Sequence, residues 1–364
     1  MTATTILKLN LGPQHPSTHG VLRLILTLDG EKITSCEPDV GYLHRGMEKM
    51  AEKLSYIQYL PMVDRIDYLA GFFYSELLCR IVEQAYEVEL SDKIRAIRIL
   101  LLELNRISSH LLWIGAFLMD LGATSPFFYA FREREMILRF FEKLTGQRMM
   151  YNYFTFGGVR RDIDYLDDVE EILNILPEKL EDYRKLISEN PIFIQRTEKK
   201  GILDSKTALD YAITGVNLRS SGFCLDTRLQ DNLYKGFDIG IVIKEEKDSL
   251  ARYQARIDEI KESMSIIKQA LEIIKLHPNL EQKLINPITL KLPEGDYHSE
   301  IEAPRGIAGC FIRSYGEKEP YRLKWRTGSY YSVNLLRKLL VGEYLNDAIA
   351  IAGSLDIILP EVDK

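Results

Sequence analysis

The sequence predicts an α+β fold, in which a small antiparallel β region precedes a helical core and a smaller mixed region. Residues 6–11 and 21–28 alternate apolar and polar side chains, as half-buried strands do. From Met47 to about Leu276, apolar residues recur at the three- and four-residue spacings typical of amphipathic helices. The last part, after Pro293, returns to weak alternation interrupted by glycine and proline.

These patterns divide the chain into three regions. Residues 1–47 are the N-terminal β region, 48–276 the helical core and 277–364 the mixed C-terminal region. The stretch 278–293 contains three prolines and little periodicity, so it is the best candidate for a boundary. We expect the three regions to pack as one compact unit.

The β region begins with a strand, a loop and a hairpin. Asp29-Gly30 is a strong two-residue turn signal, leading into a strand at Lys32–Pro38. The loop before the second strand carries His15 and His19 among two prolines and two glycines, which predicts a stiff, shaped segment. On composition alone, the commoner interpretation is a tight turn whose histidines bond their neighbours.

The helical core contains four long predicted helices, at Asp92–Met119, Phe131–Thr145, Asp167–Ser188 and Ser249–Lys275. In the first of them Glu103, Arg106 and His110 lie close together on one face. We expect this trio to form an internal stripe of salt bridges and hydrogen bonds rather than a catalytic group.

Composition excludes several classes of protein. The chain has 364 residues, 46% hydrophobic and 27% charged, with a net charge of -6, which favours a soluble or peripheral globular protein without nucleic-acid binding. No secretory signal or apolar run long enough for a spanning helix is visible. The four cysteines form no CxxC pair and are expected to be buried thiols in a reducing compartment.

Nucleotide-binding, zinc-protease and serine-hydrolase signatures are missing from the sequence. The six histidines show no ligand spacing, so no metal site is predicted.

Six segments of the chain carry a resemblance to one family. They are Gly12–Arg23, Gly41–Lys49, Asp64–Tyr68, Pro126–Glu135, Gly157–Val159 and Leu355–Asp356. With these segments the chain resembles, nearly from end to end, the quinone-site subunit (the D-type subunit) of complex I-type NADH:quinone oxidoreductases, and the equivalent subunit of the photosynthetic, ferredoxin-linked complex. The main departure lies between Leu276 and Pro293, where complex I versions often carry an extra helix.

That family in turn resembles the large subunit of nickel–iron hydrogenases, which hold a metal pair with two CxxC motifs. Here Asp67 and Ala70 stand at the front pair of cysteine positions, and Ile358 and Glu361 at the rear pair. Without soft thiolate ligands, nickel and low-spin iron are not expected in this chain. The vacated cavity is then available to another substrate.

In the family that substrate is a quinone headgroup. The resemblance implies that His19 and Tyr68 bind the quinone oxygens as catalytic proton donors, with Asp120 as the partner of His19. Two-electron reduction leaves an oxyanion at each carbonyl, so donors at opposite ends of the ring lower the barrier. A carboxylate beside a histidine favours its protonated form near neutral pH.

The resemblance implies no cofactor bound by this chain itself. Electrons would come from the terminal iron–sulfur cluster of an adjacent subunit, close to His44, Arg45 and Met150. Many complex I versions carry histidine at the position of Met150. Because methionine cannot titrate, we expect a lower cluster potential that does not depend on pH. Alternatively, Met150 only packs and His44 supplies the proton.

The implied activity is that of a proton-translocating NAD(P)H or ferredoxin:quinone oxidoreductase, in which this chain acts only within a complex. Expected partners are the iron–sulfur subunit, other peripheral-arm subunits and a membrane-embedded subunit that admits the quinone. The expected location is peripheral, on the cytoplasmic side of the inner membrane or the stromal side of a thylakoid. Two alternatives are a metal-free scaffold subunit of a membrane-bound hydrogenase relative and a true metalloenzyme.

Overall fold

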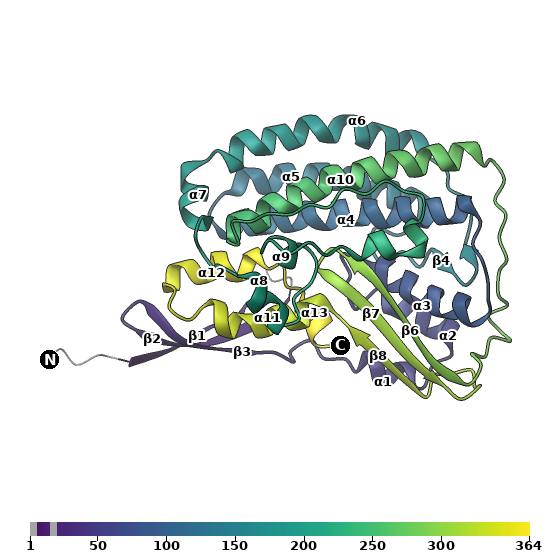
Figure 1. The fold of residues 1–364 in the computed structure, drawn as a ribbon, viewed down its shortest axis with the longest axis horizontal. Coiled ribbons are helices and arrows are strands. Elements are labelled where there is room, and N and C mark those ends of the chain that lie inside the picture. The colour runs from purple at the N-terminus through teal and green to yellow at the C-terminus, as the bar shows by residue number, and fades with distance from the viewer. Residues whose placement is uncertain (1–5, 15–19) are drawn as a thin grey trace.

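The computed structural model describes residues 6–14 and 20–364 and confirms the α+β class. Long helices lie side by side in one half of the molecule, and two three-stranded sheets lie at opposite ends of the other half (Figure 1). The strands are β1 (Ile6–Gln14), β2 (Leu22–Asp29), β3 (Lys32–Asp39), β4 (Phe154–Thr155), β5 (Gly158–Val159), β6 (Gly295–Ala303), β7 (Gly306–Ser314) and β8 (Arg322–Arg326).

The α-helices are α1 (Met47–Ala51), α2 (Tyr56–Val63), α3 (Gly71–Ala85), α4 (Asp92–Asp120), α5 (Thr124–Thr145), α6 (Leu166–Tyr183), α7 (Pro191–Thr197), α8 (Ser205–Asp210), α9 (Val216–Arg219), α10 (Ser249–Leu276), α11 (Gly328–Leu339), α12 (Leu345–Ser354) and α13 (Leu359–Val362). A π-helical turn, η1 (Arg184–Ser188), continues α6. Two short 3-10 helices, η2 (Thr227–Gln230) and η3 (Asn232–Tyr234), precede α10.

The N-terminal sheet has the antiparallel order β1-β2-β3. The apolar residues at alternate positions of β2, from Leu22 to Leu28, are buried, as the alternation predicts. Asp29 pairs with Lys32, so the turn residues are Gly30 and Glu31. The turn is thus one residue later than predicted, because Gly30, at φ 62°, takes the first central position that requires positive φ.

Helices α4, α5, α6 and α10 form the predicted helical core (Figure 1). Helix α4 ends one residue after the predicted end and is followed by Gly122, at φ 89°, in the C-terminal cap. Helix α5 begins at Thr124, seven residues before the predicted start. Pro126 lies in its first turn, where a missing N–H leaves no helical hydrogen bond unmade, so the proline does not delay the helix.

The predicted polar stripe on α4 is internal. Arg106 Nε donates to Glu103 at 3.0 Å, and His110 Nε2 lies 2.9 Å from a carboxylate oxygen of Glu259 on α10. All four of these side chains are buried, so α4 is covered on its polar face as well as its apolar one. The stripe therefore holds α4 against its neighbours.

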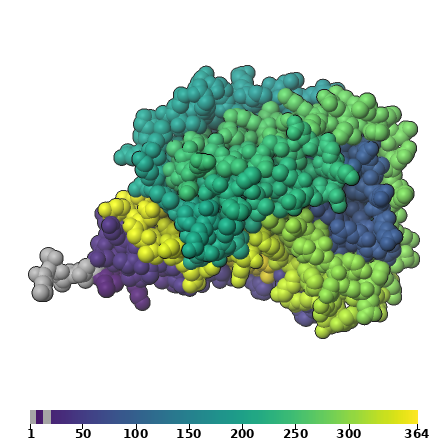
Figure 2. Space-filling view, in the orientation of Figure 1, coloured from purple at the N-terminus to yellow at the C-terminus, as the bar shows by residue number. Residues whose placement is uncertain are grey.

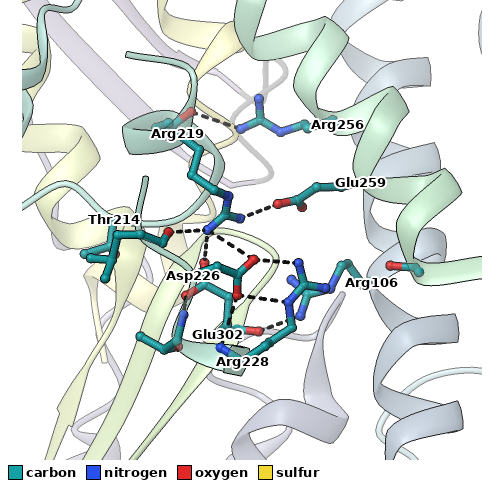
Figure 3. A network of polar contacts seen from close by, with 12 residues as sticks. Arg106, Thr214, Arg219, Asp226, Arg228, Arg256, Glu259 and Glu302 are labelled. Atoms are coloured by element: carbon teal, nitrogen blue, oxygen red, sulfur yellow. Dashed lines mark hydrogen bonds and ion pairs between the residues drawn. The ribbon is translucent and has the colours of Figure 1, made fainter. Parts of the chain in front are cut away.

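Figure 3 shows that this stripe belongs to a larger buried network. Arg219, the last residue of α9, binds Glu259 and donates to Glu302 of β6 at 2.7 Å. Arg228 binds Asp226 at 2.7 Å. These contacts attach the 214–234 segment to the long helices and to the second sheet. Breaking one partner of such a buried pair typically costs about 3–5 kcal/mol.

The second sheet, antiparallel with the order β6-β7-β8, packs on α1 and α3. The C-terminal helices α11 and α12 instead lie beside the N-terminal sheet, as the yellow and purple regions of Figure 2 show. Ile33 of β3, for example, donates its N–H to the carbonyl of Glu343 at 2.9 Å. The C-terminal residues thus contact both ends of the molecule, and the three-region division stays a prediction.

Within residues 6–14 and 20–364, no helix is both long and apolar enough to cross a lipid bilayer.

Candidate functional site

The turn Asp64–Tyr68, between α2 and α3, is the point at which the structure brings candidate site residues together. Asp64 is buried, accepts a hydrogen bond from Ser75 of α3, and accepts the N–H of Asn152 at 3.2 Å. A Cβ on Gly71 would lie 3.1 Å from the Asp64 Cβ, so the small residue lets the turn fold back closely onto α3. Burial raises the pKa of Asp64 to about 6.

Asp67, in the same turn, belongs to a buried charge cluster. Arg305, between β6 and β7, donates to the Asp67 carboxylate at 2.6 Å and to the Ser109 hydroxyl of α4 at 2.9 Å. The Asp356 carboxylate lies 3.6 Å from Arg305 Nε. We call Asp67, Arg305 and Asp356 the Arg305 triad. Burial raises the pKa of Asp67; Arg305 opposes this rise, and the nearby carboxylates of Glu361 and Asp356 add to it.

The Arg305 triad joins the front and rear segments that were compared with the hydrogenase motifs. Asp67, Ala70, Ile358 and Glu361 are all buried, and Glu361 accepts the hydroxyl of Tyr74 at 2.5 Å. Segments at opposite ends of the sequence therefore meet in one interior region. In the part of the chain that the structure describes, no group of three or more His, Cys, Asp or Glu is arranged to hold a metal ion.

Tyr68 follows the triad residue Asp67 directly and is half-buried. No residue in the described ranges forms a hydrogen bond with its hydroxyl, which leaves that group available to a ligand. Burial, reinforced by the nearby Asp67 carboxylate, raises the pKa of Tyr68 to about 12. Its phenol therefore keeps its proton throughout the neutral range.

Asp120 is the last residue of α4 and is half-buried. It lies 11 residues beyond Ser109, which corresponds to about 16 Å along the helix axis. His19, its predicted partner, lies outside the described residues. The convergence of His19, Tyr68 and Asp120 on one site therefore stays a prediction.

Gly20, next to His19 in the sequence, is described and buried. At φ 143°, its added Cβ would lie 2.7 Å from the Leu359 Cβ and 3.0 Å from a Leu43 methyl. Gly20 is therefore packed on α13, the helix that contains Glu361. Only glycine fits this close approach.

The three residues predicted to lie near a partner cluster occupy two segments. His44 and Arg45 are exposed in the connection between β3 and α1. The His44 ring nitrogen lies 2.9 Å from the Asp363 carbonyl, and Arg45 donates to the Arg65 carbonyl at 2.9 Å. Met150 is half-buried between α5 and β4.

Met150 has the left-handed conformation, at φ 60°, and so does Asn152, at φ 44°. Between them the Tyr151 ring is buried and stacked on Phe72 of α3, with ring centroids 4.2 Å apart. The Asn152 N–H bond to Asp64 holds this segment against the Asp64–Tyr68 turn. Arg45 and the segment that contains Met150 are therefore both hydrogen-bonded to the turn that carries Tyr68.

Comparisons with known proteins show the family of the chain. Residues 120–364 match the family model described as "Respiratory-chain NADH dehydrogenase, 49 Kd subunit". The chain is 47% identical to the D-type subunit of NADH-quinone oxidoreductase from Geobacillus kaustophilus and 43% identical to that from Bacillus cytotoxicus, each over 367 residues that cover 100% of both chains. The chain belongs to this family of NADH-quinone oxidoreductase subunits. A member of the family is one part of an oxidoreductase complex.

Sequence reasoning missed Arg305 and its triad. The only signal was the Pro304 to Gly306 turn, and nothing in its spacing indicates a bond to Asp67 far away in the sequence. One expectation about cysteines was wrong in part. Cys36, Cys79 and Cys310 are buried, but Cys224 is exposed because it lies in the irregular segment after α9.

Proposed function

We propose that this chain forms the quinone-reduction site of a proton-translocating NADH or ferredoxin:quinone oxidoreductase, together with an adjacent iron–sulfur subunit. Its family membership supports the class of complex. In this proposal the chain binds the quinone headgroup and delivers protons, and the electrons come from the adjacent subunit. The assembly would dock peripherally on a membrane-embedded subunit that admits the quinone.

One observation carries the proposal: the short turn Asp64–Tyr68 joins the residues expected near the iron–sulfur cluster to the residue expected to donate a proton to the quinone. It accepts hydrogen bonds from Arg45 and from Asn152, two residues after Met150. It also carries Tyr68, whose hydroxyl faces no described hydrogen-bonding partner. This turn would therefore connect a cluster seated near Arg45 and Met150 to a quinone bound at Tyr68.

The chemistry requires two electrons and two protons for each quinone. The electrons enter the ring and place negative charge on both carbonyl oxygens. Tyr68 would donate its phenolic proton to one oxygen, and His19, held protonated by Asp120, would donate to the other. Both donors are then reprotonated from solvent, so the net reaction forms one quinol and consumes two electrons and two protons.

Purification through a tag on this chain tests the proposal. Membranes solubilised in mild detergent should yield a complex that contains an iron–sulfur subunit and reduces a water-soluble quinone with NADH or reduced ferredoxin. The same complex should not consume hydrogen. Hydrogen uptake, or a complex that lacks both quinone reduction and an iron–sulfur subunit, would contradict the proposal and favour the hydrogenase-type scaffold.

Met150 carries a second prediction. Met150→His should raise the potential of the terminal cluster and make it fall with pH, because an imidazole that gains a proton on reduction stabilises the added electron. In this variant the cluster potential should fall by up to about 59 mV per pH unit near the imidazole pKa. In the parent the cluster potential should not change with pH. Redox titration followed by electron paramagnetic resonance measures this potential.

Met149→His is the matched control for this experiment, since Met149 is also half-buried and lies one position away. It should leave the potential unchanged. A steep pH dependence in the parent, removed by His44→Gln, would assign the proton to His44 instead.

A further inference from the structure

Arg134 lies near the middle of α5, in the segment Pro126–Glu135. Its side chain is buried, with 7% of the residue exposed. Among the described residues no hydrogen bond or ion pair is made by any of its three guanidinium nitrogens, and its Nε is fully enclosed without a partner. A buried charge of this kind is costly unless something neutralises it.

The other buried arginines of the described chain all have hydrogen-bond partners. Arg98, for example, binds Glu83 at 2.6 Å, and Arg252, which lacks a carboxylate, donates to Ser354 at 2.9 Å. The same holds for Arg106, Arg219, Arg228, Arg256 and Arg305. Arg134 thus differs from all of them.

The carboxylates on either side of Arg134 are already used by other groups. Glu133 accepts the hydroxyl of Tyr183 at 2.5 Å and is paired with Arg132 at 2.6 Å. Glu135 is paired with Arg148 at 2.5 Å and with Arg139 at 3.2 Å. The negative charge of Glu135 partly offsets the effect of burial on Arg134, but neither acid forms a hydrogen bond or an ion pair with its guanidinium.

The surroundings of Arg134 are aromatic. Its guanidinium carbon lies 5.9 Å from the centre of the Phe131 ring, and its positive charge partly offsets the rise that burial causes in the pKa of Tyr151 and Tyr68. Burial lowers the pKa of Arg134 itself, but an arginine stays protonated near neutral pH. A fixed positive charge in an apolar, desolvated region near Tyr68 is therefore available to an anion.

We infer that Arg134 contacts the quinone headgroup and stabilises the negative charge that develops on its oxygens before the protons arrive. The inference rests on the proposed function and assigns to that site a third polar group that donates no proton. The guanidinium forms hydrogen bonds to the oxygen anion while Tyr68 and His19 transfer their protons, so no covalent bond to Arg134 forms or breaks. A neutral quinone gains less from this charge than its reduced anion does, as transition-state stabilisation requires.

The first test compares Arg134→Met with the control Arg139→Met in the assembled complex. Arg139 lies on the same helix, with 73% of its side chain exposed. Arg134→Met should lower kcat for quinone reduction by about 100-fold, the typical loss of one oxyanion donor, with KM changed less than about threefold. Arg139→Met should match the parent. A turnover of Arg134→Met within twofold of the parent would overturn the inference.

The second test does not depend on turnover. The probes are 2-hydroxy-1,4-naphthoquinone, which is ionised at neutral pH, and its neutral methyl ether. The parent complex should bind the ionised probe more tightly than the ether. Arg134→Met should reduce the ratio of the two affinities by about tenfold, which corresponds to the loss of one charge-assisted hydrogen bond. If the role of Arg134 were purely structural, the variant would bind both probes more weakly by the same factor. An unchanged ratio of the two affinities would overturn the inference.

Arg134→Lys keeps the inference testable if the methionine variant fails to assemble, because lysine retains the charge but not the planar fork. It should keep the preference for the ionised probe and recover part of the turnover, and loss of the preference would contradict the inference.

Tyr68→Phe distinguishes a failure of the Arg134 inference from a failure of the proposed quinone site. If it abolishes turnover while Arg134→Met does not, only the Arg134 inference fails. If neither variant affects turnover, the proposed site itself fails.

Discussion

Tyr68→Phe is expected to lower quinone reduction by about 100- to 10,000-fold, the range typical of a lost proton donor. The substitution removes one hydroxyl and keeps the ring, and no described residue depends on that hydroxyl for a hydrogen bond. The fold should therefore be retained. With its pKa raised to about 12, Tyr68 stays protonated across the assay range, so the loss should be similar at pH 6 and pH 8.

Turnover with a water-soluble quinone measures this effect, alongside the extent of cluster reduction by dithionite. Tyr297→Phe is the matched control, since that half-buried hydroxyl donates to the Pro293 carbonyl at 3.1 Å, away from the turn, in the second sheet. It should keep parental turnover. His19→Ala should resemble Tyr68→Phe. If Tyr68→Phe assembles, leaves the cluster reducible and turns over like the parent, Tyr68 is not a donor.

The second large effect concerns the Arg305 triad. Arg305→Met should destabilise the chain by about 3–5 kcal/mol, because it leaves Asp67 buried without its paired cation and removes one of the positive charges beside Asp356. Such a loss is a large share of the stability of a typical domain, so we expect little assembled complex. The amount of complex on native gels and its thermal inactivation measure the effect.

Combining Arg305→Met with Asp67→Asn should recover much of the loss. The amide oxygen can still accept the N–H groups of Leu69 and Ala70, as Asp67 does at 3.0 and 3.2 Å, and Asp356 keeps Arg256 at 3.9 Å. Arg313→Met is the surface control: it breaks a bidentate pair with Asp296 whose side chains are about half exposed, and should cost under about 1 kcal/mol. An Arg305→Met complex as abundant as this control would show that the triad contributes little.

Local patterns predicted much of the fold. Helix α4 is correct to within one residue because its apolar spacing is regular and its cap is a glycine. The start of α5 was placed too late because the aromatic run Phe127–Phe131 hides the helical period. The polar stripe of α4 was recognised as internal, but its partner Glu259 was not, since 149 residues separate it from His110.

The candidate site was less predictable than the fold. The family segments indicated Tyr68 and Arg45 as site residues. They did not indicate that Arg45 is hydrogen-bonded to the same turn that contains Tyr68. Arg305 reaches Asp67 across 238 residues of sequence, and no local pattern encodes such a bond. Nothing in the sequence distinguishes Arg134 from the charged residues beside it, and only its burial in three dimensions does so.

The most direct test of the account is a structure of the assembled complex with a quinone bound. We predict that one carbonyl oxygen of the headgroup lies about 2.6–3.2 Å from the Tyr68 hydroxyl and the other at the same range from His19, with Asp120 bonded to that imidazole. A headgroup bound elsewhere, with Tyr68 turned away from it or Asp120 out of reach of His19, would contradict the account.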